Sequence, residues 1–133
     1  MTCLGDVQGS GDARQRRGRL ACLSGRMAEE TVAARYEARG CRLLESRWRG
    51  RAGEIDLILR DGDDLVFVEV KCSTSHALAA QRLDRRQMDR ICLSALDYAD
   101  RASGGRPVTM RFDVALVDEL GRIDVIPNAF GMN

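Results

Sequence analysis

Two short segments, residues 53–60 (GEIDLILR) and residues 65–71 (LVFVEVK), constrain the fold of this chain more than any other feature of its sequence. Apolar residues recur at every second position in both, which is typical of β-strands because successive side chains of a strand point to opposite faces. Residues 61–64 (DGDD) between them are of the types that form tight turns. The pattern therefore predicts a β-hairpin.

The two faces of the predicted hairpin differ in character. One face is wholly apolar and is expected to lie in the core: Ile55, Leu57, Leu59, Val66, Val68 and Val70. The other face carries Glu54, Asp56, Ile58, Phe67, Glu69 and Lys71. With a turn at 61–64, Asp56 lies directly opposite Glu69, and Glu54 lies directly opposite Lys71. Directly opposed side chains have Cβ atoms roughly 4.5–5.5 Å apart.

Two carboxylates at that separation repel each other unless a cation lies between them. Mg²⁺ prefers oxygen ligands, takes only one or two carboxylates in many sites, and leaves the remaining positions to water and phosphate. Lys71 follows Glu69 by two positions on the same face, where it can orient or deprotonate a water molecule. The pattern predicts a metal site formed by Asp56 and Glu69 with Lys71 beside it.

A solvent-facing hairpin is the alternative interpretation. In that case the charged side chains form ordinary cross-strand contacts, with an ion pair between Glu54 and Lys71. Two observations favour the metal site. Aspartate opposite glutamate is a poor structural pair, and Lys71 is the only lysine in a chain whose other basic residues are arginines, which do not readily release a proton.

Patterns outside the hairpin predict one α/β domain over residues 24–133, preceded by a disordered basic arm over residues 1–23. Ser24 is the predicted N-cap of the first helix, and Gly40 follows its end. The expected elements are a helix over Met27–Arg39, strands over 41–48, 108–117 and 123–126, a loop over 73–77, and a long helix over about 80–102. This order predicts a central mixed β-sheet flanked by helices.

Composition limits the classes of function. The net charge is +1, with 21 Lys+Arg against 20 Asp+Glu, so nucleic-acid binding must come from local clusters of arginine. The five cysteines are odd in number and include no CxxC pair, which argues against a disulfide framework or a zinc site. No apolar run approaches the roughly 20 residues of a membrane span. We therefore expect a cytoplasmic protein without a membrane partner.

The hairpin residues Gly53–Ile58 and Leu65–Lys71 resemble the central signature of the YraN family of small bacterial proteins. Flanking segments agree: 33–36 (AARY) with Gly40 upstream, and 111–114 (RFDV) and 127–130 (PNAF) downstream. The resemblance runs from about Gly25 to Phe130. That family is similar to the PD-(D/E)xK superfamily of nucleases, which implies a restriction-endonuclease-like fold for the domain.

The resemblance also implies site residues and an activity. Asp56 and Glu69 match the metal ligands, Lys71 matches the catalytic lysine, and Glu30 matches a glutamate of the first helix, with Glu29 as a rival. Gln87 aligns where the family usually has a lysine. The implied activity is Mg²⁺- or Mn²⁺-dependent hydrolysis of DNA, in repair or recombination, and relatives that cut both strands often form homodimers.

Arginines provide the remaining candidate contacts. Arg49 and Arg51, together with Arg47, lie around Trp48 just before the hairpin. In that position they could contact a nucleic-acid strand along its length. Arg86 lies in a stripe with Arg82 and Arg90 that could contact phosphates, although a solvated helix face is the simpler interpretation. Because a fold does not determine a function, a non-catalytic module that binds nucleic acid or a partner protein is the alternative to a nuclease. Arg111 and Asp113 are expected to form a structural ion pair.

Overall fold

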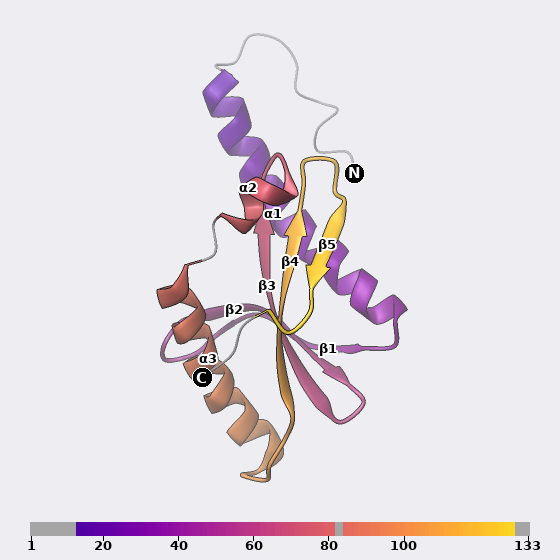
Figure 1. Cartoon of the computed structure of the whole chain (residues 1–133), viewed down its shortest axis with the longest axis vertical. Coiled ribbons are helices and arrows are strands. Elements are labelled where there is room, and N and C mark those ends of the chain that lie inside the picture. Colours follow the sequence, from indigo (N-terminus) through magenta and orange to yellow (C-terminus); the bar gives the residue numbers. More distant parts are fainter. Residues whose placement is uncertain (1–12, 82–83, 130–133) are drawn as a thin grey trace.

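The structure is a computed structural model that describes residues 13–81 and 84–129, with side chains from residue 25 onward. Its elements in chain order are α1 (Ala13–Ala38), β1 (Arg42–Arg49), β2 (Glu54–Asp61), β3 (Asp64–Cys72), α2 (His76–Ala80), α3 (Arg85–Ser103), β4 (Met110–Val117) and β5 (Ile123–Ile126) (Figure 1). The strands form one sheet in the order β1-β2-β3-β4-β5. Only β3 and β4 run parallel, so the predicted mixed sheet with flanking helices is confirmed.

The β2–β3 hairpin has the predicted register. Leu57 pairs with Val68 and Ile58 pairs with Phe67, and the ladder continues to Asp61 and Asp64 at the turn. Gly62 has φ of +63°, a left-handed conformation that glycine adopts at little cost because it has no Cβ. The hairpin was predictable because turn chemistry and alternation agree on one register.

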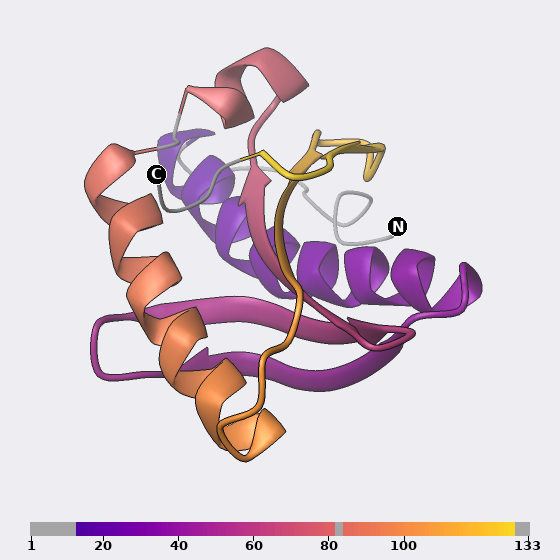
Figure 2. The same cartoon turned by 60° about the horizontal axis from the view of Figure 1, so that its bottom comes forward.

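Both faces of the hairpin are buried, which differs from the predicted single core face. Helix α1 covers one face, where Val32 and Tyr36 belong to a cluster with Leu57 and Val66. Helix α3 covers the other face, where its buried residues Ile91, Cys92, Ala95 and Ala99 join Ile55, Ile58, Leu65 and Phe67. Figure 2 shows the two helices on opposite sides of the strands. A parallel connection between neighbouring strands needs a crossover, and here α2 and α3 provide it.

Of the residues predicted to share the apolar face, Ile55 is the one that packs on the opposite side of the sheet. It is fully buried as expected, yet it packs in the α3 cluster with Trp48 and Ile91 rather than with Leu57 on the α1 side. The described β2–β3 ladder ends at Leu57, so residues before it are not held to the alternation of the hairpin.

Two predicted helix boundaries are wrong. Helix α1 begins at Ala13, well before the predicted N-cap Ser24, so part of the predicted arm is helical and residues 1–12 lie outside the described residues. The helix predicted over about 80–102 begins later, at Arg85, and a separate short helix, α2, starts inside the predicted loop over 73–77. Ser75 caps α2 by accepting a hydrogen bond from the Leu78 backbone, and Asp84 caps α3 by accepting one from the Arg86 backbone. These caps satisfy backbone N–H groups at two separate starts.

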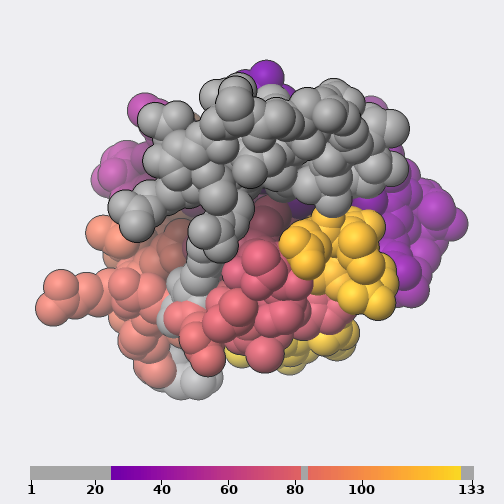
Figure 3. Space-filling model, turned by 90° about the horizontal axis from the view of Figure 1, so that it is seen from above, coloured from indigo at the N-terminus to yellow at the C-terminus, as the bar shows by residue number. Residues whose placement is uncertain are grey.

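Helix α2 packs beside the turn between β4 and β5, as the surface in Figure 3 shows. One ring nitrogen of His76, Nε2, lies 2.9 Å from the carbonyl oxygen of Arg122. The C-terminal hairpin is therefore tied to the crossover. Among the described residues, none of the helices combines the length and apolar character that spanning a bilayer requires.

Candidate functional site

The predicted site residues of the hairpin come together in a cavity of about 310 Å³ on the α3 side of the sheet. Asp56 comes from β2, Glu69 from β3, and Gln87 from the first turns of α3, which also provides the lining residue Arg90. Lys71 reaches the same cluster through its contact with Glu69. Asp56, Glu69, Lys71 and Gln87 were all proposed from the sequence, and the structure brings all four together.

Glu69, Lys71 and Gln87 form a closed set of contacts. The Lys71 ammonium lies 2.9 Å from Glu69 Oε2 and donates a 2.9 Å hydrogen bond to Gln87 Oε1. The amide of Gln87 in turn donates a 2.7 Å hydrogen bond from Nε2 to Glu69 Oε2. Glu69 is 5% exposed, so these charge-assisted contacts operate away from bulk water. Gln87 thereby fixes the positions of both the carboxylate and the ammonium.

The charged form of Asp56 is destabilised by its surroundings. Its Oδ2 accepts a 2.8 Å hydrogen bond from the Val70 backbone. Burial, and then the charge of Glu69, raise the pKa of Asp56 to about 7, against the lowering effects of Val70 and Lys71. The two carboxyl groups line the same cavity, so the charge of each disfavours ionisation of the other. At neutral pH this pair is therefore poised between binding a proton and binding a cation.

Glu54 and Lys71 do not form the ion pair that the solvent-facing interpretation expected. Lys71 is paired with Glu69, whereas Glu54 lies 3.6 Å from the guanidinium of Arg49. The side chain of Lys71 is only 15% exposed. This face of the hairpin is therefore a partly buried site rather than a solvated surface.

The structure separates the two candidate glutamates of α1. Burial raises the pKa of Glu29 against the effect of its Arg47 hydrogen bond, and the charge of Asp56 raises it further. Glu29 is half-buried and feels the charge of Asp56, whereas Glu30 is exposed. Arg47 donates a 2.7 Å hydrogen bond to Glu29 and has φ of +52°, which is uncommon for a residue with a Cβ. Burial and charge therefore make Glu29 the better candidate of the two.

Most of the candidate basic contacts already have partners. Arg51 donates two hydrogen bonds to Asp97 of α3, at 2.9 and 3.0 Å, and Arg49 is paired with Glu54. Arg86 is exposed at the start of α3, near the site. Arg90 belongs to the stripe that the sequence interpreted as a phosphate contact or, more simply, a solvated helix face, and it lines the cavity. Arg82, which the same stripe included, lies outside the described residues.

A tight loop, missed by the sequence reasoning, holds the start of β2 against α3. Ser94 is fully buried, and its hydroxyl donates a 3.0 Å hydrogen bond to the carbonyl of Gly53. A Cβ on Gly50 would lie 2.6 Å from the Trp48 ring and 2.7 Å from Ser94 Oγ, closer than real contacts allow. A serine inside the apolar stripe of α3 was the only signal for this contact.

The donor set of the site suits a hard divalent cation. Its oxygens come from the carboxylates Asp56 and Glu69, and Mg²⁺ commonly takes one or two carboxylates and completes its shell with water and substrate phosphate. The described residues hold no group of three or more His, Cys, Asp or Glu side chains arranged to bind a metal. Two carboxylates alone would leave most coordination positions of such a cation to solvent or substrate.

Comparison with models of protein families shows which family this chain is related to. The sequence matches the model described as "Uncharacterised protein family UPF0102" over residues 28–117, a range that includes Glu29, the hairpin and Gln87. The chain belongs to this family. UPF0102 is the YraN family, so the resemblance seen in the sequence is confirmed at the level of the family. The similarity to nucleases stays a prediction.

Similar UPF0102 proteins cover nearly the same length. One from Cereibacter sphaeroides is 51% identical over 113 residues, which are 85% of this chain and 97% of the relative. A protein from Ruegeria pomeroyi is 50% identical over 115 residues, 86% of this chain and 94% of the relative. One from Dinoroseobacter shibae is 49% identical over 116 residues, 87% of each chain. Their names state the family and no activity.

Proposed function

We propose that this UPF0102 protein is a metal-dependent nuclease that hydrolyses phosphodiester bonds in DNA. The observation that carries the proposal is the pair of facing carboxylates, Asp56 and Glu69, with the ammonium of Lys71 held beside them. A buried pair of like charges costs stability, and such a cost is common at sites where a bound ion or substrate removes it. The resemblance to PD-(D/E)xK nucleases supports the same assignment.

The residues of the chain have distinct roles in this proposal. Asp56 and Glu69 hold the cation, and Mg²⁺ or Mn²⁺ would polarise a phosphate oxygen and make a bound water more acidic. Lys71 provides a positive charge and hydrogen-bond donors next to the reacting phosphate. Gln87 is a positioning residue because its amide links the Lys71 ammonium to Glu69. Arg90, an exposed residue that lines the cavity, would contact a neighbouring phosphate of the substrate.

The test is cleavage of labelled single-stranded, duplex and branched DNA in Mn²⁺. We expect the wild type to cut at least one substrate, EDTA to stop it, and both Asp56→Ala and Lys71→Ala to lose activity by about 10²-fold or more. Asp63→Asn, at an exposed aspartate of the hairpin turn, is the matched control and should cut normally. Equal cutting by all variants would identify a contaminating nuclease and contradict the proposal.

A non-catalytic binding module is the second candidate. It is favoured by Gln87, which stands at the site where the family usually has a lysine, so the site has one cation fewer for catalysis. Under this candidate the wild type binds DNA without turnover, and its affinity falls with salt concentration because phosphate contacts release counterions. An affinity that does not change with salt would argue against nucleic acid as the ligand of either candidate.

A further inference from the structure

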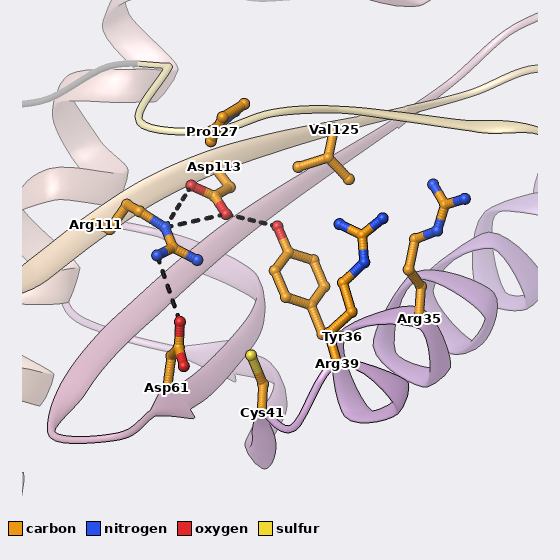
Figure 4. A pocket seen from close by; sticks show the side chains of 9 residues that line it. All are labelled: Arg35, Tyr36, Arg39, Cys41, Asp61, Arg111, Asp113, Val125 and Pro127. Carbon is orange, nitrogen blue, oxygen red and sulfur yellow. Dashed lines mark hydrogen bonds and ion pairs between the residues drawn. The ribbon is translucent and has the colours of Figure 1, made fainter.

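A second cavity, of about 210 Å³, lies on the α1 side of the sheet, whereas the carboxylate site lies on the α3 side. Figure 4 shows the residues that line it. Arg35 and Arg39 project from the end of α1 toward β5, and Arg111 projects from β4. Val125 and Pro127 supply an apolar wall. The proposed nuclease function uses none of these residues.

Positive charge is in excess around this cavity. Three guanidinium groups face two carboxylates, those of Asp61 and Asp113. Both carboxylates are taken by the same arginine, because Arg111 lies 3.0 Å from Asp113 Oδ1 and 3.6 Å from Asp61 Oδ2. The cavity therefore has no carboxylate to spare for the other two arginines.

Among the residues whose side chains the structure describes, neither Arg35 nor Arg39 has an acidic partner. Arg35 donates one hydrogen bond, 3.1 Å long, to the carbonyl of Ile123. Within the described residues, the guanidinium of Arg39 forms no hydrogen bond or ion pair with a carboxylate. Like charges four residues apart near the end of a helix repel each other. An anion between the two guanidinium groups would remove that repulsion and use their free N–H groups.

The two titratable residues at the base of the cavity add no negative charge. Burial raises the pKa of the Cys41 thiol, and the charge of Asp61 raises it further. Burial, with the hydrogen bond to Asp113, also raises the pKa of Tyr36. Both groups stay neutral at physiological pH, so they do not compete with an anionic ligand.

We propose that this cavity binds a phosphate group of a small molecule, held by Arg35 and Arg39 with Arg111 behind it. Guanidinium groups match phosphate because their planar N–H donors can contact two oxygens at once. The volume is below the roughly 300–1,000 Å³ of pockets for drug-sized ligands. The pocket therefore accommodates a phosphate with a small apolar or planar group against Val125 and Pro127, and not a length of nucleic acid.

Calorimetric titration at constant ionic strength in EDTA tests the proposal. The probes are inorganic phosphate, a 5′-mononucleotide, the matching nucleoside, and an oligonucleotide without terminal phosphates. We expect phosphate and the mononucleotide to bind, with the mononucleotide tighter, and the nucleoside not to bind. Binding of phosphate alone would support a free oxyanion as the ligand. Binding of only the oligonucleotide, or no saturation by any phosphate probe up to about 20 mM, would overturn the proposal.

Variants locate the binding site. Arg39→Gln should weaken binding of the phosphate probes about tenfold, and Arg35→Gln with Arg39→Gln should weaken it further. Arg39→Lys should fall between, because it keeps the charge and loses the planar fork. The control Arg26→Gln removes an exposed arginine from the same helix and should bind as the wild type does.

A second control excludes the carboxylate site as the place of binding. Arg90→Gln removes the arginine that lines that site, and it should leave the affinity for phosphate unchanged. Circular dichroism should show that every variant is folded. Unchanged affinity in the double variant, or loss of binding in Arg90→Gln instead, would overturn the proposal.

Discussion

Two regions of the sheet contain a buried aspartate, Asp113 in one and Asp56 in the other, and the partners of the two carboxylates differ in kind. Asp113, 1% exposed, accepts hydrogen bonds from the Tyr36 hydroxyl at 2.7 Å, from Arg111 Nε at 3.0 Å, and from the Asn128 backbone at 2.9 Å. Every partner of this carboxylate is a donor. Asp56 accepts a hydrogen bond from one backbone donor and faces the carboxyl group of Glu69.

The difference teaches how to separate structural from functional carboxylates. A carboxylate surrounded by donors is stabilised in its charged form and holds elements together. Asp113 joins α1, β4 and the segment after β5, and its predicted ion pair with Arg111 is confirmed. A carboxylate that faces another is destabilised, so its retention calls for a ligand. By this criterion Asp56 and Glu69 are the residues that we propose as the site, and Asp113 is structural.

Removal of the Asp113 carboxylate, whose partners are all donors, should have the largest effect on the free energy of unfolding. Asp113→Ala leaves the Tyr36 hydroxyl, the Asn128 amide and Arg111 without their acceptor, so we expect the free energy of unfolding to fall by about 4 kcal/mol. Urea denaturation measures it. The exposed Asp63→Ala is the control and should change the free energy by less than about 0.5 kcal/mol. A small loss of unfolding free energy in Asp113→Ala would contradict the structural role of this carboxylate, because its donors would then find other acceptors.

Replacement of Asp56 should have the opposite effect on the free energy of unfolding. Because the pKa of Asp56 is about 7 in the folded protein against 3.8 ordinarily, the folded state binds the proton more tightly. The free energy of unfolding of the metal-free wild type should therefore fall as pH rises from about 4 to about 7. Asp56→Asn lacks this titration and should be more stable than the wild type at pH 8 by roughly 2 kcal/mol, with little difference at pH 4.

Thermal or urea unfolding of both proteins in EDTA at the two pH values makes this measurement. Asparagine can accept from the Val70 amide and donate to Glu69, so its shape and hydrogen bonds are matched. A variant that is less stable than the wild type at pH 8 would show that Asp56 is a satisfied structural carboxylate.

A smaller effect is expected when Asp113 loses only one donor. Tyr36→Phe removes the 2.7 Å hydrogen bond and keeps the ring in the α1 cluster. We expect a loss of about 1 kcal/mol in the free energy of unfolding and no change in metal binding. A change in metal affinity would mean that the two carboxylate regions are coupled through the sheet.

The smallest effect distinguishes the two glutamates of α1. Glu29→Gln should weaken Mn²⁺ binding about threefold, ~0.6 kcal/mol, because a charge near Asp56 is lost. Glu30→Gln, the neighbouring and exposed control, should leave the affinity unchanged. The reverse result would favour Glu30 as the helix glutamate that the family resemblance indicated.

The hairpin and its site were predictable because local rules agree there. The turn at 61–64 fixes the register, which the structure keeps as far as Leu57 and Val68, and extending it by one pair predicts Asp56 opposite Glu69. No distant contact is needed for that inference. The order of strands and helices also followed from periodicity, since long patterned segments outweigh errors at their ends.

Other features depend on tertiary packing, which a single sequence does not specify. Successive residues on a helix point about 100° apart, so the rotation of α1 on the sheet decides whether Glu29 or Glu30 faces Asp56. Gln87 bridges Glu69 and Lys71 only because α3 begins at Arg85, after the break that Asp84 caps. The second buried face of the hairpin likewise depends on where the crossover helix lies.

Titration of the metal-free protein with Mn²⁺, followed by calorimetry at pH 7.5, tests most directly whether the facing carboxylates form a metal site. The account expects saturable binding by the wild type, loss of that binding in Asp56→Asn and Glu69→Gln, and unchanged binding in the control Asp63→Asn. Absence of binding by the folded wild type, or equal binding by Asp56→Asn, would contradict it.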